Sequence, residues 1–412
     1  MKTHGWAVVI VLGILLALPA AAAGQADAPA AAGPSEAGDA APAGALPPEL
    51  AEIVERQWEN LETGRILEFV RELNRESEGR LPPLDWDAVT GIVRGEGFPY
   101  SARDVLGAVV HALFGAIVDN IGLLGRLVLL AVLLAVLHLL QSAFERETVA
   151  SAAYTVVYLA MITVALVAFY EAVSVAREVV DSLVGFMQAI LPLLITLLAG
   201  VGAVVSAGLL SPLAVILVNG VGMIVADAVL PLIFLGSVLD VADHLPGRVR
   251  VGRLAAFIRH SGMIVLSLSL TVFLGVMAVQ GAAGSVADGV LLRTAKFTAG
   301  TFIPVLGGMF ADAAELVFGS SLLLKNAVGL LGAVMVLLLA VFPLLKVVAL
   351  ILTFRLAAAL VQPISEGPFV DALATMADGL VQIGLATGAV TLMFFLMLTV
   401  VLGAGSAAVM LR

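Results

Sequence analysis

Long runs of hydrophobic residues, interrupted by short charged groups, make up most of this 412-residue chain. A helix needs roughly 20 apolar residues to cross a bilayer. Several runs have about this length or more, namely residues 121–144, 149–170, 187–226, 262–283 and 379–411. Their length predicts membrane-spanning α-helices, and not the roughly 10-residue strands of an outer-membrane barrel.

The overall composition agrees with this pattern. Hydrophobic residues make up 61% of the chain and charged residues 13%, whereas soluble domains carry about 25% charged residues. We therefore predict an all-α, polytopic helical membrane protein with about six to eight spans. Some of these spans either cross the membrane fully or are re-entrant segments. The net charge of −10 argues against nucleic acid as a partner, because phosphate binding needs a basic surface. The chain has no cysteine, which excludes disulfides and thiolate catalysis.

The region before the membrane domain divides into three parts. Residues 1–23 have a basic start, an apolar core and a small-residue end, which predicts a signal peptide; an uncleaved first span is the alternative. Residues 24–45 are rich in Ala, Pro and Gly, as is typical of a flexible linker. Residues 46–103 are acidic and have helical spacing, which predicts a small extracytoplasmic segment. It either packs on the membrane domain or a partner, or forms a solvated stalk. The multi-span membrane domain is predicted for residues 104–412.

Two features of the membrane domain bear on its topology. The uncharged run 187–226 is long enough for two crossings, and residues 207–212 predict the turn between them. Asp227 follows this run, and it is either paired within the bundle or part of a polar path. Four Arg residues between 248 and 259 predict an interfacial helix and favour the cytoplasmic side. Four spans from an outside start place that helix outside, so either one segment is re-entrant or the positive-inside rule has an exception here.

The stretch 293–346 combines charges and helix breakers between apolar runs. Lipid cannot satisfy such segments, so they must be buried in protein or line water. Asp312 and Glu315 share one helix face and are placed to pair with Lys296 or Lys325. An interfacial helix whose acids stabilise its own fold is the alternative. The candidate assembly or passage residues are Asp227, Lys296, Gly300, Pro304, Gly307, Asp312, Glu315, Lys325, Asn326 and Lys346.

Motifs for catalysis do not occur in the sequence. It has no GxxxxGK[ST] phosphate loop, no HExxH and no GxSxG nucleophile elbow. The five His residues do not pair at metal-ligand spacing. We therefore predict no catalytic, cofactor-binding or metal site, and a protein that is not an enzyme.

Four short segments carry a resemblance to a known family. They are KFTAGTFIPVLG at 296–307, KNAVG at 325–329, PLLK at 343–346 and AAALVQPI at 357–364. On these segments the chain resembles the stage III sporulation protein AE family of endospore-forming bacteria. The similarity extends from about residue 46 to the C-terminus. Within this range, the segment before the membrane domain matches the family only in being helical and acidic.

The resemblance implies a function that physical reasoning alone does not reach. It implies a non-enzymatic, multi-pass subunit of the secretion-like sporulation channel complex that links mother cell and forespore and is required for endospore development. The chain would lie in the mother-cell membrane around the forespore, with its N-terminal segment extracytoplasmic after signal cleavage. The implied partners are membrane lipid, the other stage III sporulation A membrane proteins, a separate cytoplasmic ATPase subunit and forespore-side channel proteins. No cofactor is implied.

Two other functions are weighed against this one. A self-contained secondary transporter or permease would use Asp227 and the broken segment around Pro304 as its midplane site. The sequence shows no repeat of that broken segment in its other half, as inverted-repeat transporters tend to have. A purely scaffolding subunit would differ from the channel subunit only in having no passage, and the sequence does not separate these two.

Overall fold

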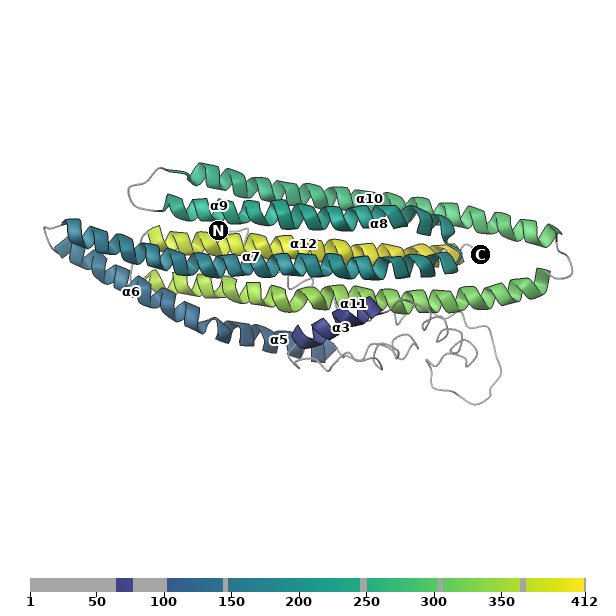
Figure 1. The fold of residues 1–412 in the computed structure, drawn as a ribbon, viewed down its shortest axis with the longest axis horizontal. Helices are drawn as coiled ribbons and strands as arrows, with labels where there is room; N and C mark the ends of the chain where they lie inside the picture. Colours follow the sequence, from purple (N-terminus) through teal and green to yellow (C-terminus); the bar gives the residue numbers. More distant parts are fainter. Residues whose placement is uncertain are drawn as a thin grey trace.

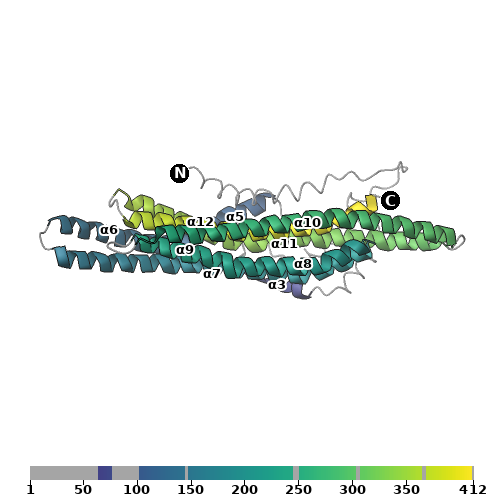
Figure 2. The same cartoon turned by 90° about the horizontal axis from the view of Figure 1, so that it is seen from above.

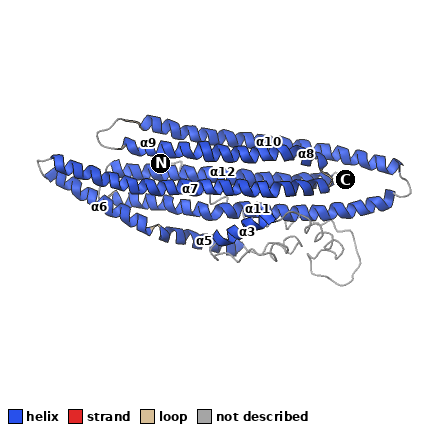
Figure 3. Cartoon of the chain, in the orientation of Figure 1, coloured by secondary structure: helices blue, strands red, loops and turns tan. Residues whose placement is uncertain are grey.

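Helices form every regular element that the structure describes (Figures 1 and 3). The computed structural model describes residues 64–76, 102–143, 147–244, 250–302, 307–363 and 368–410. The elements are α3 (Gly64–Glu76), α5 (Ala102–Asp119), α6 (Ile121–Ala143), α7 (Glu147–Gly200), α8 (Val204–Ile224), the π-helix η1 (Val225–Val229), α9 (Leu230–Asp243), α10 (Gly252–Phe302), α11 (Gly307–Val361) and α12 (Pro368–Met410). No strand occurs within these ranges, and the all-α prediction is confirmed.

Six segments among the described helices are long and apolar enough to cross a membrane. They are Leu106–Leu137, Thr155–Gly200, Val204–Asp243, Gly252–Gly281, Phe318–Val361 and Pro368–Ala404. The chain is therefore a polytopic helical membrane protein, and the six segments agree with the lower end of the predicted number of spans.

The helices run side by side in an elongated bundle (Figures 1 and 2). Helices α7, α10 and α11 contain 54, 51 and 55 residues, which is about 80 Å at 1.5 Å per residue. This length is more than twice the roughly 30 Å hydrocarbon thickness of a bilayer. The run 149–170 and the first part of the run 187–226 were predicted as separate spans, but both belong to α7, which continues through the charged residues 171–181. Charged side chains on the exposed side of a helix do not interrupt its backbone hydrogen bonds.

Helix α11 lies in the interior of the bundle. Every residue from 331 to 345 is buried, and the helix packs against α12, α7, α5 and α6. A helix that is apolar on all sides can be buried on all sides, and residues 326–345 contain no charged side chain. Helices α8, α9 and α10 form a second group, which contacts the first mainly through α12 and α7.

The connection between α7 and α8 corrects the predicted turn at residues 207–212. Helix α7 ends at Gly200 and α8 begins at Val204, with Gly202 between them at a φ of 92°. This left-handed conformation is one that glycine adopts without strain. Residues 207–212 lie inside α8 instead, because helices in membrane proteins tolerate Gly, Ser and Pro.

The Arg-rich segment does not form a separate interfacial helix. Helix α10 begins at Gly252, so Arg253 and Arg259 lie in its first turns, and the helix continues without a break through residues 262–283. Arg248 lies outside the described residues. Arg259 forms an ion pair with Asp240 of α9 (2.9 Å between Nη1 and Oδ2), which joins the two helices near their connection.

The predicted interruption after residue 293 falls between α10 and α11. Helix α10 ends at Phe302 and α11 begins at Gly307. Gly300 lies within the last turn of α10, and Pro304 lies outside the described residues. The stretch 293–346 therefore contributes the end of one long helix and more than half of the next.

The closest backbone approach between α9 and α10 gives a test of this packing. A Cβ atom at Gly236 would lie 2.9 Å from the backbone nitrogen of Arg259 and 3.0 Å from the carbonyl oxygen of Ala255. Because backbone atoms cannot move aside as a side-chain tip can, we expect Gly236→Ala to lower the free energy of unfolding by about 1–3 kcal/mol.

The measurement is thermal unfolding of the purified protein in detergent. Gly275→Ala in α10 is the matched control, because a Cβ atom there would have no neighbour within 4 Å. The added helix propensity should leave that variant unchanged or more stable by about 0.5–1 kcal/mol. Equal stability of the two variants would contradict the close α9–α10 contact.

Candidate functional site

The ten candidate residues do not gather at one place. Lys296 and Gly300 lie near the end of α10, and Gly307, Asp312 and Glu315 lie at the start of α11. The side-chain surroundings of these five lie outside the described part of the structure. Pairing of Asp312 or Glu315 with Lys296 therefore stays a prediction. The remaining described candidates fall into three environments, around Lys325, Asp227 and Lys346.

Lys325 is a fully buried charged residue in the interior helix α11 (0% exposed). Its Nζ donates a hydrogen bond to the carbonyl oxygen of Leu402 in α12, at 2.6 Å. One turn further along α11, Gly329 leaves room for the side chain of Leu402, which a Cβ atom at that position would overlap. Backbone carbonyls are common partners of intramembrane cations. The described partner of Lys325 is thus a carbonyl on α12, and its pairing with Asp312 or Glu315 stays a prediction. The next residue, Asn326, is exposed.

Asp288 is a second buried charge that the sequence reasoning did not select. Its carboxylate accepts hydrogen bonds from the backbone N–H groups of Val205 (2.9 Å) and Ser206 (3.2 Å to Oδ2). These belong to the first residues of α8, whose N–H groups have no partner within the helix, and a carboxylate is favourable at that end of the helix dipole. A signal was present in the sequence, because Asp288 directly follows 27 uncharged residues, 261–287.

The two buried charges lie at the same end of the bundle. Asp288 binds the start of α8, immediately after the turn at Gly202. Lys325 lies one turn beyond Ser321, whose Oγ would be 3.3 Å from a Cβ atom at Gly200. The α7–α8 turn is therefore held between a charge from α10 and the buried residues Ser320 and Ser321 of α11.

Asp227 pairs with Arg177 of α7, so the paired alternative is observed, with the pair at the surface of the bundle. Asp227 lies in η1, a π-helical turn inside the otherwise continuous helix from α8 to α9. Such a turn inserts one extra residue and shifts the side chains around it. Both partners are about half exposed (52% and 56%). We call the exposed charged residues at this level the charge belt: Glu171, Arg177, Glu178, Asp181 and Asp227.

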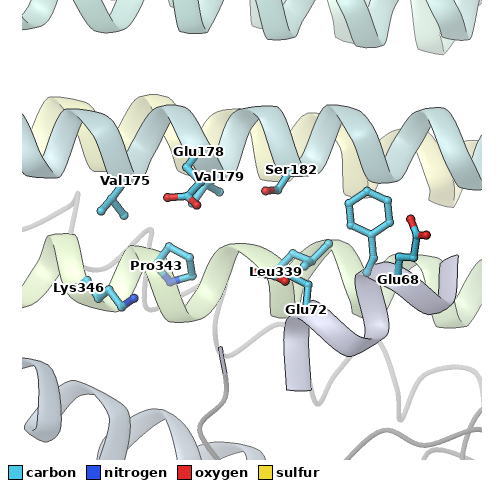
Figure 4. Close-up of a pocket in the computed structure, with 10 residues that line it drawn as sticks. Glu68, Glu72, Val175, Glu178, Val179, Ser182, Leu339, Pro343 and Lys346 are labelled. Atoms are coloured by element: carbon cyan, nitrogen blue, oxygen red, sulfur yellow. The ribbon is translucent and has the colours of Figure 1, made fainter. Parts of the chain in front are cut away.

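Lys346 lines a pocket of about 260 Å³ beside the charge belt (Figure 4). The pocket lies between α3, α7 and α11, and Figure 4 shows residues of α7 facing Pro343 and Lys346 of α11. Its lining residues are Glu68, Phe69, Glu72, Val175, Glu178, Val179, Ser182, Leu339, Pro343 and Lys346. Three carboxylates and one ammonium thus share the pocket. Among the described residues, no group of His, Asp or Glu is arranged to hold a metal ion.

Helix α3 forms one wall of this pocket. The ring of Phe69 packs edge-on against Phe186 of α7, with 5.5 Å between ring centroids. Ile66, Val70 and Leu73 are also buried. Of the two alternatives for the acidic N-terminal segment, packing on the membrane domain therefore holds for α3.

These observations define the class of protein, which is a multi-pass helical membrane protein whose buried charges join its helices. A sequence model of the stage III sporulation protein AE family matches residues 86–405. The stage III sporulation protein AE of Bacillus subtilis (strain 168) is 38% identical over 361 residues, which cover 88% of this chain and 90% of that protein. No solved structure matches the chain. The chain belongs to the stage III sporulation protein AE family, which is a family of sporulation proteins and not a known enzyme family.

The role of Lys325 can be tested by two substitutions. Lys325→Ala removes the hydrogen bond to Leu402 and leaves a cavity, which we expect to cost about 2–4 kcal/mol of unfolding free energy. Lys325→Met fills the same volume without a charge, and buried ionic groups can often be replaced in this way at little cost. We therefore expect Lys325→Met to keep most of the stability.

Chemical unfolding in detergent measures both variants. Lys346→Ala is the control, since this exposed side chain should contribute no more than about 0.5 kcal/mol. If Lys325→Met is as unstable as Lys325→Ala, the charge itself, and not the filled space, holds α11 to α12.

The contact made by Asp288 predicts the order in which three variants lose unfolding free energy. Asp288→Ala leaves the N–H groups of Val205 and Ser206 without their acceptor, which we expect to cost about 1–3 kcal/mol. Asp288→Asn keeps a carbonyl oxygen and should lose less. Asp378→Ala is the control, because the Asp378–Arg355 pair is 3.5 Å long and about 40% exposed, and such pairs contribute about 0–1 kcal/mol. Thermal unfolding of the three variants gives the order, and equal loss in all three would argue against a capping role.

Proposed function

We propose that this protein is a non-enzymatic, multi-pass membrane subunit of the secretion-like channel complex that links mother cell and forespore, and that endospore development requires it. Membership of the stage III sporulation protein AE family is the observation that supports this proposal most strongly. The fold agrees with a structural role, since the buried charges of α10 and α11 are used to join helices.

The location and partners form part of the same proposal. The protein would lie in the mother-cell membrane around the forespore, with the segment before the membrane domain on the extracytoplasmic side. It would assemble with the other stage III sporulation A membrane proteins and with forespore-side channel proteins. Energy would come from a separate cytoplasmic ATPase subunit, a division of labour that agrees with the lack of a phosphate loop in this sequence.

The transporter alternative depends on Asp227 as a midplane site. In the structure, the Asp227 carboxylate is engaged by Arg177 and about half exposed. The described pocket lies instead on the opposite side of α7, toward α3 and α11. Asp227 therefore has the surroundings of an ion-paired surface residue, which supports the channel-subunit proposal over the transporter.

Deleting the gene in the sporulating host tests the proposal. We expect normal vegetative growth and a loss of heat-resistant spores of at least about a hundredfold, with arrest after the forespore has formed. The count of heat-resistant colonies measures the effect, and co-purification from sporulating cells identifies the partners.

Re-expression of the wild-type chain is the control and should restore the spore count. The stable variant Gly275→Ala should restore it equally, whereas a strongly destabilised variant such as Lys325→Ala should not. A normal spore count in the deletion strain would contradict the proposed function. Uptake of a solute by vesicles that contain the purified protein alone would favour the transporter.

A further inference from the structure

Five helical segments without a charged residue run through one half of the bundle. They are residues 182–200 of α7, 204–226 of α8 and η1, 261–287 of α10, 326–345 of α11 and 379–404 of α12. Each is about 30–40 Å long at 1.5 Å per residue, which matches the hydrocarbon thickness of a bilayer. We call this part of the bundle the uncharged layer.

Polar contacts bound the uncharged layer at both ends. At one end, Asp288 binds the start of α8 and Lys325 binds Leu402. At the other end, Arg177 pairs with Asp227, and the charged residues Lys346 and Glu178 line the same pocket without an ion pair between them. Because these groups come from α7, α8, η1, α10, α11 and α12, the layer has a consistent depth across the bundle. The layer has the length and the composition of a membrane-spanning region.

Helix α3 lies against this layer, although it carries many charges. Phe69 contacts Phe186, and a Cβ atom at Gly185 would lie 3.3 Å from the Phe69 ring. Phe69 also shares the pocket with Leu339 of the uncharged run of α11. Four exposed charged residues are described in helix α3, and one of them, Glu68, also lines the pocket. They are Arg65, Glu68, Arg71 and Arg75. We call this side of the bundle, α3 with the pocket, the α3 face.

The side of the bundle formed by α8 and α10 has a different surface at the same depth. Its exposed large side chains are apolar, for example Ile216 (64% exposed) and Val272 (53% exposed). Such a surface suits lipid. The α3 face does not, because charged groups at this depth must be paired within protein or face water. Lipid therefore covers one side of the layer and is excluded from the other.

Water is the occupant that the charges of the α3 face favour. Five charged residues of this face make no ion pair with another described residue, and they include positive and negative charges. They are Arg65, Glu68, Arg71, Glu178 and Lys346. A protein neighbour would have to supply a matched partner for each, since a buried unpaired charge is costly. Water satisfies all of them without a fixed geometry.

We propose that the α3 face lines a water-filled passage at the depth of the bilayer, with helix α3 as its charged lining. This rests on the proposed function as a channel subunit and assigns the passage to a definite side of the chain. Helix α3 is then part of the membrane-level assembly, and the α8–α10 side is its lipid-facing side.

Single cysteines in this cysteine-free chain test the assignment. Arg65→Cys and Glu68→Cys place a thiol on the α3 face, and Ile216→Cys and Val272→Cys are matched exposed positions on the lipid side. The probe is a charged, membrane-impermeant maleimide, applied to membranes from sporulating cells that contain the assembled protein. We expect labelling at the α3 face to be at least about tenfold faster, because thiolates form in water and not in hydrocarbon.

A second measurement establishes that α3 lies at the expected depth while it is labelled. The pair Phe69→Cys and Gly185→Cys should be joined by a short bifunctional thiol reagent in the same membranes, whereas Phe69→Cys paired with Ile216→Cys should not. Labelling of the α3 face without this cross-link would overturn the proposal, because α3 would then lie away from the membrane layer.

The remaining outcomes also decide the question. If neither side is labelled, the α3 face is sealed by lipid or by another protein. If both sides are labelled equally, the uncharged layer is not in the bilayer. Each of these results overturns the proposal. These results are independent of the spore count in the deletion strain. The passage assignment can therefore fail while the proposed sporulation function stands, and the failure of each is distinguished by its own measurement.

Discussion

The burial of α11 is the constraint on which the rest of the bundle depends. A helix of 55 residues with an unbroken buried stretch needs neighbours on every side. Helices α7 and α12 supply most of them, and α5 and α6 cover the remaining side. Close packing requires small residues where helices approach, as at Gly332, whose missing side chain makes room for Ile190. The order of the helices around α11 follows from this requirement.

Polar groups inside such an apolar bundle are stable only where a partner is supplied. Lys325 and Asp288 both find backbone partners, one a helical carbonyl and the other the free N–H groups at a helix start. Each contact joins residues on different helices, so the charges that are expensive to bury also fix how those helices align. Asp227 and Arg177 solve the same problem at the surface by pairing with each other.

The length of the helices separates this protein from a simple stack of membrane spans. Helix α7 carries two apolar stretches with the charged residues 171–181 between them, all within one helix. A single bilayer cannot cover both stretches of a straight helix about 80 Å long. The uncharged layer and the charge belt therefore divide the bundle into parts that meet different surroundings, and α3 is placed where these parts join.

The sequence by itself determined the helical membrane class, the end of α10 near Gly300 and the functional family, because run lengths, helix breakers and local motifs are properties of neighbouring residues. It left two alternatives for Asp227, an ion pair or a polar path. Only the tertiary structure decided the partners: Arg177 is 50 residues from Asp227, and Leu402 is 77 residues from Lys325. It likewise decided that the turn falls at Gly202 and that α7 is continuous. Packing between distant helices selects these features, and no local pattern of residues contains that information.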